Sequence, residues 1–109
     1  MAEVREASGT EDQLIEALSG VDICVTQMAP LTERILQASP DLRLFCVSRG
    51  GPVNADLETA TRHGVAVSFA PGRNATATAE HTVALMMAAA RRVPATHADL
   101  AAANWRGDY

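Results

Sequence analysis

The chain has 109 residues, enough for one hydrophobic core but few for a complete enzyme. Hydrophobic residues make up 48% and charged residues 20%, which is a globular composition and excludes a disordered or fibrous chain. Nine basic and thirteen acidic residues give a net charge of −4, so the charge gives no reason to expect nucleic acid as a partner. All nine basic residues are arginines, each able to bind a carboxylate or phosphate with two hydrogen bonds.

The two cysteines, Cys24 and Cys46, lie in apolar, strand-like runs and have neither metal-ligand nor redox spacing. We expect buried, reduced thiols, which suit a cytoplasmic protein. No run approaches the ~18 apolar residues of a membrane span, and the first residues, "MAEVREAS", do not form a signal peptide. We therefore predict a cytoplasmic domain with no metal site and no membrane partner.

Strand-like and helix-like segments alternate along residues 1–74. Strands are predicted, in chain order, at 2–7 (a weak pattern), 21–26, 42–48 and 65–70, and helices at 9–20, 29–40 and 54–64. Thr10 and Gln13 have the spacing of a capping box at the start of the first helix. Because the connections are too long for hairpins, we predict an α/β fold with a flavodoxin-like open parallel sheet of about four strands and helices on both faces.

The pattern changes after Pro71. Residues 75–93 form a long Ala-rich helix without a clean polar face, and a second helix is predicted after Pro94. A helix that is apolar nearly all round must be buried on more than one side. Either a second domain or a second copy of the chain would cover it, and we favour the second copy. We therefore divide the chain into a partial flavodoxin-like unit, 1–74, and a C-terminal helical arm, 75–109, and expect a homodimer through residues 75–103.

Ligands of open parallel sheets bind beyond the carboxyl ends of the strands, so we consider the loops that begin there. One contains Arg49, Gly50 and Gly51, and another contains Gly72 and Arg73 before the long helix. Glycines allow backbone N–H groups to approach a ligand or adopt positive φ, and arginines bind carboxylates. The loops predict a small anion site. The alternative is that Gly50 and Gly51 only turn the chain and both arginines are solvated.

Residues 50–105 resemble the substrate-binding domain of D-isomer-specific 2-hydroxyacid dehydrogenases, the superfamily of phosphoglycerate, glyoxylate and formate dehydrogenases. The matching elements keep the family's order and spacing over residues 42–105. They are Gly51, Asn54, Asp56, the segment "DLETATRHGVAV", Ala70-Pro71, Asn74, Ala79-Glu80-His81, Arg91 and Trp105.

The resemblance implies a two-domain enzyme that reduces a 2-oxo acid with NADH or NADPH, or runs the reverse reaction. In that family the glycine-rich loop binds the substrate carboxylate through backbone N–H groups, which implies this role for Ser48, Arg49, Gly50 and Gly51. Asn74 matches a substrate-contacting asparagine of the formate dehydrogenase branch, and Thr78 falls where the linking helix passes the nicotinamide. The long helix would be the interdomain helix and contribute to the dimer contact.

Two positions depart from the family pattern: Val53 replaces an aspartate, and Arg49 replaces a small residue. Both leave the identity of the 2-hydroxy acid open. The family's catalytic residues and its Gly-x-Gly-x-x-Gly dinucleotide loop lie in a nucleotide-binding domain, which we expect to be absent from this chain. We therefore expect no catalytic residue here, and no NAD or NADP bound by this chain alone.

The predicted function is the substrate-binding domain of an NAD(P)-dependent oxidoreductase that acts on small 2-hydroxy or 2-oxo acids. The alternative is a non-catalytic, dimerising remnant or assembly module with at most weak carboxylate binding. A receiver-type signalling domain has a similar topology, but it needs an acidic cluster at the strand ends, where these loops are basic or neutral.

Overall fold

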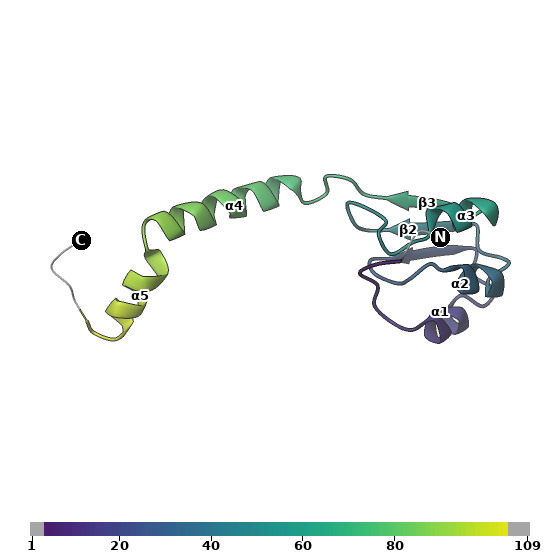
Figure 1. The fold of residues 1–109 in the computed structure, drawn as a ribbon, viewed down its shortest axis with the longest axis horizontal. Coiled ribbons are helices and arrows are strands. Elements are labelled where there is room, and N and C mark those ends of the chain that lie inside the picture. The colour runs from purple at the N-terminus through teal and green to yellow at the C-terminus, as the bar shows by residue number, and fades with distance from the viewer. Residues whose placement is uncertain (1–3, 105–109) are drawn as a thin grey trace. The chain divides into compact units, whose positions relative to one another are not determined.

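The computed structural model describes residues 4–104 and divides into two compact units, Met1–Arg73 and Asn74–Tyr109 (Figure 1). Trp105, one of the residues that carry the family resemblance, lies outside the described residues.

The first unit is built on a parallel sheet of three strands, in the order β1-β2-β3. The strands are β1 (Ile23–Thr26), β2 (Leu44–Val47) and β3 (Ala66–Phe69). Cys24, Phe45 and Val67 are aligned across the sheet, as are Val25, Cys46 and Ser68. The three apolar segments predicted between residues 21 and 70 therefore form strands, and the parallel arrangement is confirmed.

Three short helices belong to this unit: α1 (Glu11–Ala17), α2 (Glu33–Ala38) and α3 (Leu57–Arg62). The predicted capping box is present, because the Thr10 hydroxyl accepts from the Gln13 N–H and the Gln13 side chain accepts from the Thr10 N–H. Side-chain oxygens of Thr32 and Asp56 cap α2 and α3 by accepting from the N–H groups of Ile35 and Thr59, without the reciprocal bond. Each helix thus begins where a polar side chain satisfies free backbone N–H groups.

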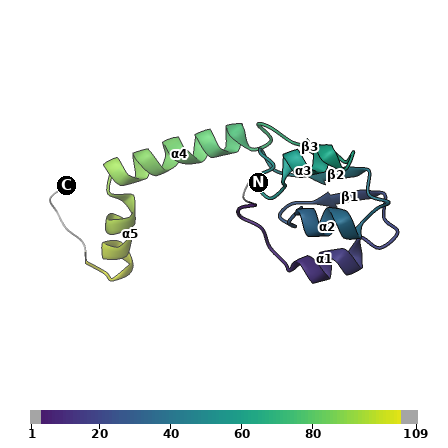
Figure 2. The same ribbon diagram turned by 45° about the vertical axis from the view of Figure 1, so that its right-hand side comes forward.

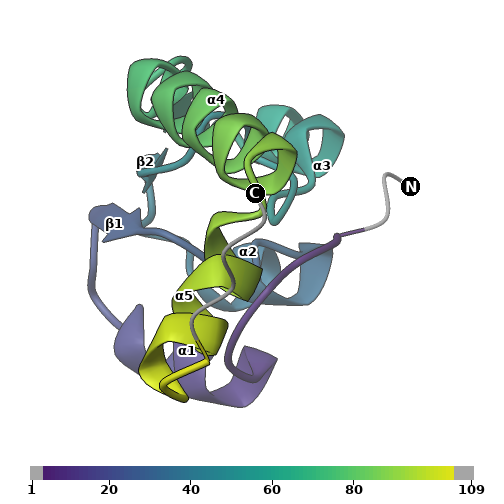
Figure 3. The same ribbon diagram turned by 90° about the vertical axis from the view of Figure 1, so that its left-hand side faces the viewer.

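Within this unit the helices cover one face of the sheet; in Figure 3, α2 and α3 lie on the same side of β1 and β2. Right-handed crossovers that step in one direction, from β1 to β2 to β3, place their helices on one face. The expectation of helices on both faces is therefore wrong for this unit. Ile23 and Val25 on the other face are 53% and 73% exposed. The buried core consists of Leu18, Leu31, Ile35, Leu36, Leu42, Phe45, Val47, Ala55, Ala60 and Val65.

The predicted strand at 2–7 is wrong for the residues that the structure describes, 4–7, and the sheet has three strands rather than about four. Glu6 has φ +52°, a left-handed conformation that a strand does not contain. The Arg5 N–H donates to the Val53 carbonyl at 2.9 Å, and the Ser8 N–H to the Met28 carbonyl at 2.8 Å. This segment therefore bonds to loops rather than to a strand.

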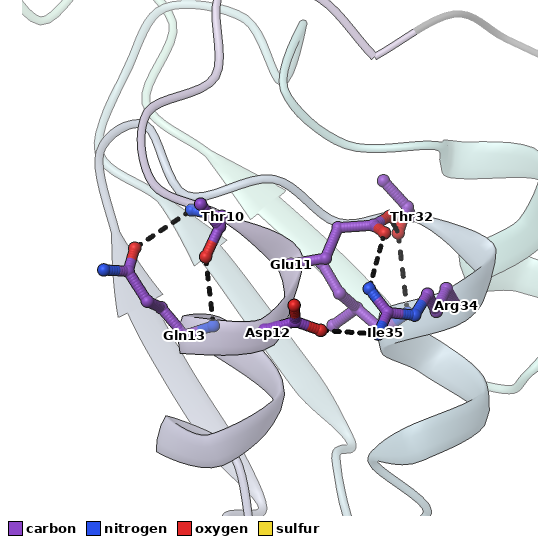
Figure 4. Close-up of polar contacts among 7 residues, drawn as sticks. All are labelled: Thr10, Glu11, Asp12, Gln13, Thr32, Arg34 and Ile35. Carbon is purple, nitrogen blue, oxygen red and sulfur yellow. Dashed lines mark hydrogen bonds and ion pairs between the residues drawn. The ribbon is translucent and has the colours of Figure 1, made fainter.

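Polar contacts link α1 to α2 (Figure 4). Arg34 donates to Glu11 at 3.1 Å and to Asp12 at 2.5 Å, and the Thr32 hydroxyl donates to Glu11. The Thr32 hydrogen bond and then the Arg34 contact lower the pKa of Glu11. The pair of helices is therefore held by charge as well as by the apolar side chains beneath it.

The second unit contains α4 (Ala75–Ala90) and α5 (Val93–Ala101). Arg92 has a left-handed backbone, with φ +53°, and separates α4 from α5. Pro94 lies in the first turn of α5, where its missing N–H needs no partner. The break predicted at Pro94 therefore occurs two residues earlier. Between residues 4 and 104, no helix is both long and apolar enough to span a membrane.

Candidate functional site

The carboxyl ends of the three strands meet at one edge of the sheet, on the left of the first unit in Figures 1 and 2. The loop after β2 lies between the loops that follow β1 and β3. The Ser48 N–H donates to the Thr26 carbonyl at 2.8 Å, and the Ala70 N–H to the Arg49 carbonyl at 2.8 Å. Ser48 and Arg49 therefore lie at the centre of the edge where open parallel sheets bind ligands.

The Arg49 side chain is mostly buried at this edge. It is 24% exposed, and its Nη2 is 2.5 Å from Glu6 Oε2. Its Nη1 is buried without a hydrogen-bond partner among the described residues. The alternative of a freely solvated side chain is therefore wrong for Arg49. A buried guanidinium with a donor left over is suited to bind an anion.

Gly50 and Gly51 follow directly in the same loop, where Gly50 is exposed and Gly51 is half-buried. Neither has the positive φ considered from the sequence, which is found at Gly9, Gly20, Gly64 and Gly72. A Cβ built on either residue has no other heavy atom within 4 Å, apart from its chain neighbours. Neither the φ angle nor packing within the fold thus explains the Gly50-Gly51 pair.

Asn54 joins the loops after β1 and β2. Its side chain is fully buried, and Nδ2 donates to the Ala29 carbonyl at 2.7 Å. The Leu31 N–H donates to the Asn54 carbonyl at 2.8 Å, and the Asp56 N–H donates to the Leu31 carbonyl at 2.9 Å. The far end of the Arg49 loop is therefore held against the neighbouring loop.

Asp56 holds the same loop to α3. One carboxylate oxygen accepts from the Thr59 N–H at 3.1 Å and the other from the Thr59 hydroxyl at 2.8 Å. These bonds lower the pKa of Asp56, with the backbone bond contributing most. Asn54 and Asp56 thus have structural roles that position the site, although the sequence singled them out only through the family resemblance.

The other predicted site residues lie in the second unit. Asn74 is the N-cap residue of α4, without a side-chain hydrogen bond to the helix, and Thr78 lies in the first turn. Ser48, Arg49, Gly50 and Gly51 are together on one loop of the first unit. Their roles stay predictions, as do those of Asn74 and Thr78. Arg73, which the sequence offered as a second arginine for the anion, is exposed.

Within residues 4–104, no three His, Cys, Asp or Glu side chains are grouped so that they could hold a metal ion. Both cysteines are free and half-buried rather than fully buried as expected, and burial raises the pKa of Cys24. A thiol held in its protonated form is a poor nucleophile.

Sequence reasoning missed Glu6. The residue lies in a segment predicted as a strand, 43 positions before the arginine that it contacts. No local pattern signals an ion pair over that separation. The one indirect indication is that an arginine, once mostly buried, needs a negatively charged partner somewhere in the chain.

A family model described as "D-isomer specific 2-hydroxyacid dehydrogenase, catalytic domain" matches residues 2–106. The chain belongs to this family of 2-hydroxyacid dehydrogenases. The match covers both structural units and includes every predicted site residue. It also favours the dehydrogenase interpretation over that of an assembly module.

Among the relatives, the D-3-phosphoglycerate dehydrogenase of Archaeoglobus fulgidus is 32% identical over 103 residues, which cover 94% of this chain and 20% of that protein. The D-3-phosphoglycerate dehydrogenase of Mycobacterium bovis is 35% identical over 106 residues, with 95% and 20% covered. The chain therefore spans about a fifth of the length of these relatives.

Solved structures show the same fold. An acyclic imino acid reductase (Bsp5), in complex with NADPH and D-arginine, matches with a TM-score of 0.78 and 21% identity over 87% of this chain and 31% of that one. The NAD-dependent formate dehydrogenase of Staphylococcus aureus, in complex with NAD, matches with a TM-score of 0.71 and 23% identity, covering 87% and 30%.

Proposed function

We propose that the loop of Ser48, Arg49, Gly50 and Gly51 binds the carboxylate of a small 2-oxo or 2-hydroxy acid, as part of an NAD(P)-dependent D-2-hydroxyacid dehydrogenase. Arg49 supplies the charge, and the glycine backbone supplies N–H groups that no side chain shields. Membership of the family supports the reaction class, and the position of the loop at the carboxyl ends of the strands supports the place proposed for the acid.

One observation supports this proposal most strongly: a mostly buried arginine precedes two glycines that have open space at the Cβ position. Open space beside a glycine that the fold does not require leaves room for a ligand to approach the backbone. Arg49 Nη1, buried and unpartnered among the described residues, is a donor that a carboxylate oxygen would satisfy.

Calorimetric titration of the chain with glyoxylate and with pyruvate tests the proposal. Binding is expected, and Arg49→Ala is expected to weaken it by about tenfold or more, because a charge-assisted hydrogen bond contributes about 1.5–3 kcal/mol. Arg43→Ala is the matched control, because Arg43 directly precedes β2 and lies at the opposite end of the same strand. Equal affinity in both variants would contradict the proposal.

The dinucleotide is a separate matter. Within the 109 residues no Gly-x-Gly-x-x-Gly sequence occurs, so none of the strand–helix turns matches the dinucleotide fingerprint. We assign no step of hydride transfer to these residues. Thr78 is the one position that we propose to lie near a nicotinamide in the complete enzyme, and NAD or NADP would supply or accept the hydride there.

We also propose that residues 75–103 form a homodimer contact. Val83, Leu85, Met86 and Met87 of α4 are each more than half exposed, and α4 has no buried residue. At about 100° per residue these side chains point in several directions around the helix, so one flat surface cannot cover them all. A second copy of the chain provides a partner of matching length and chemistry.

Leu85→Asp tests this contact, because a charge buried in an apolar interface is costly. The wild-type chain is expected to have a dimeric mass by light scattering at micromolar concentration, and the variant a monomeric mass. Leu57→Asp is the control, because it makes the same substitution at an exposed position of α3, outside residues 75–103. A monomeric wild-type chain would refute the dimer.

A further inference from the structure

Residues 4–8, which we call the N-terminal strap, run past the carboxyl edge of the sheet before α1 begins, as the purple trace in Figures 1 and 2 shows. We propose that the strap is displaceable and that its Glu6 occupies Arg49 as an internal carboxylate. The strap would therefore compete with an anionic ligand for the arginine. The identity of that ligand rests on the function proposed above, whereas the occupation of Arg49 does not.

The contact between Glu6 and Arg49 resembles the contact that a bound acid would make. The group on Arg49 Nη2 is a carboxylate oxygen at 2.5 Å, which is the group that a 2-oxo acid would bring. A mostly buried guanidinium without a counter-charge is unfavourable, so Glu6 stabilises the site when no ligand is bound. Replacing one carboxylate by another keeps the charge balance of the arginine.

The ion pair between Glu6 and Arg49 leaves part of the guanidinium without a hydrogen bond among the described residues. Glu6 bonds to Nη2 through one oxygen, while Nη1 stays buried without a partner among the described residues. An arginine and a carboxylate form their most favourable pair through two parallel hydrogen bonds. A free ligand that bonds to both nitrogens would therefore gain an interaction that Glu6 does not make.

The backbone of the strap is strained at Glu6. Glu6 has φ +52°, which is unfavourable for a residue with a Cβ, and its side chain is 64% exposed. The Arg5 N–H donates to the Val53 carbonyl and the Ser8 N–H to the Met28 carbonyl, and both acceptors lie in loops. A strained backbone that is bonded to loops rather than to a strand favours a segment that leaves its place readily.

Two variants release the strap in different ways. Glu6→Gln removes the charge from the contact, and Ser8→Pro removes the N–H that donates to Met28. Glu16→Gln is the matched control, because it removes the same charge from an exposed position on α1. The accessibility of Arg49 is measured by the rate at which phenylglyoxal modifies it, and mass spectrometry identifies the modified residue. The exposed Arg43 serves as an internal reference in each sample.

The rate at Arg49 is expected to rise several-fold in Glu6→Gln and Ser8→Pro and to stay unchanged in Glu16→Gln. Glyoxylate is expected to bind Glu6→Gln about three- to tenfold more tightly than wild type. The gain reflects the strength of the Glu6–Arg49 ion pair that glyoxylate no longer has to break, which is modest because the pair is partly exposed. Damage to the fold would weaken binding, so a gain identifies competition.

An unchanged Arg49 rate in both strap variants would overturn the inference, and so would glyoxylate binding that Glu6→Gln does not strengthen. Failure of the proposed function has a different signature. If Arg49 becomes reactive in both variants and no variant binds glyoxylate or pyruvate, the strap covers Arg49 as inferred and the loop is not an oxo-acid site.

Discussion

Replacing Gly51 by alanine tests whether this glycine is required for the stability of the fold or for the binding of a ligand. A Cβ at Gly51 would have no atom beyond its chain neighbours within 4 Å, and its φ is not in the left-handed region. Alanine is therefore expected to leave the free energy of unfolding unchanged or to raise it by about 0.4–1 kcal/mol, because it restricts the unfolded chain. For a unit of this size the melting temperature would rise by about 2–8 °C at most.

Gly64→Ala is the matched control. Gly64 also has open space around it, but its φ is +72°, and it precedes β3 at the edge opposite the candidate site. A left-handed alanine costs about 1–2 kcal/mol, so this variant is expected to melt several degrees lower than wild type. Its affinity for glyoxylate, measured where the protein is folded, is expected to be unchanged.

Glyoxylate binding is expected to weaken in Gly51→Ala, the variant whose stability is retained. The new methyl group of Gly51→Ala would occupy the space through which a carboxylate reaches the backbone N–H groups, so glyoxylate affinity is expected to fall by about tenfold to a hundredfold. Thermal unfolding followed by circular dichroism and calorimetric titration measure the two effects. The reasoning is refuted if Gly51→Ala loses as much stability as Gly64→Ala, or if it binds glyoxylate as tightly as wild type.

Two further predictions concern the contacts that hold the site and its helices. Asp56→Ala is expected to lower the free energy of unfolding by about 1–2 kcal/mol through loss of the α3 cap, and Asp56→Asn by less. Because the pKa of Asp56 is lowered in the folded state, the ionised carboxylate stabilises the fold above its ordinary pKa of 3.8, and this stabilisation is lost as the pH falls further. Urea titrations should therefore give a smaller difference in the free energy of unfolding between wild type and Asp56→Asn at pH 3 than at pH 7. Arg34→Gln is expected to lower the melting temperature, and the difference should shrink in about 1 M salt, where screening acts over about 3 Å. It should also shrink as Glu11, whose pKa is lowered from 4.5, becomes protonated in acid; a difference independent of salt and pH would contradict the ion pair.

Local signals in the sequence predicted much of the fold. The Thr10–Gln13 spacing marks the start of α1, and three apolar runs mark the three strands. These signals succeed because a cap or a buried strand is determined by residues close together in the chain. The same holds for the position of the Arg49 loop at the carboxyl end of a parallel strand, whereas its place between the two other loops depends on the strand order.

What the sequence did not predict depends on contacts between distant residues. Strand 2–7 was predicted from a short run, but the left-handed Glu6 and the bonds of residues 5 and 8 to distant loops direct the chain elsewhere. The side of the sheet on which helices lie depends on the order of the strands, which alternation alone does not specify. The burial of Arg49 and its pairing with Glu6 likewise arise only when the two segments meet.

The central claim is that the loop of residues 48–51 holds a carboxylate. Two-dimensional ¹⁵N NMR of the labelled chain during titration with glyoxylate tests it residue by residue. The largest shifts are expected at the amides of Ser48, Arg49, Gly50 and Gly51, with the Arg49 side-chain Nε–H moving at the same concentration and Gly64 unmoved. Saturating glyoxylate that moves no amide in this loop, or that moves only amides at the opposite edge of the sheet, would contradict the account.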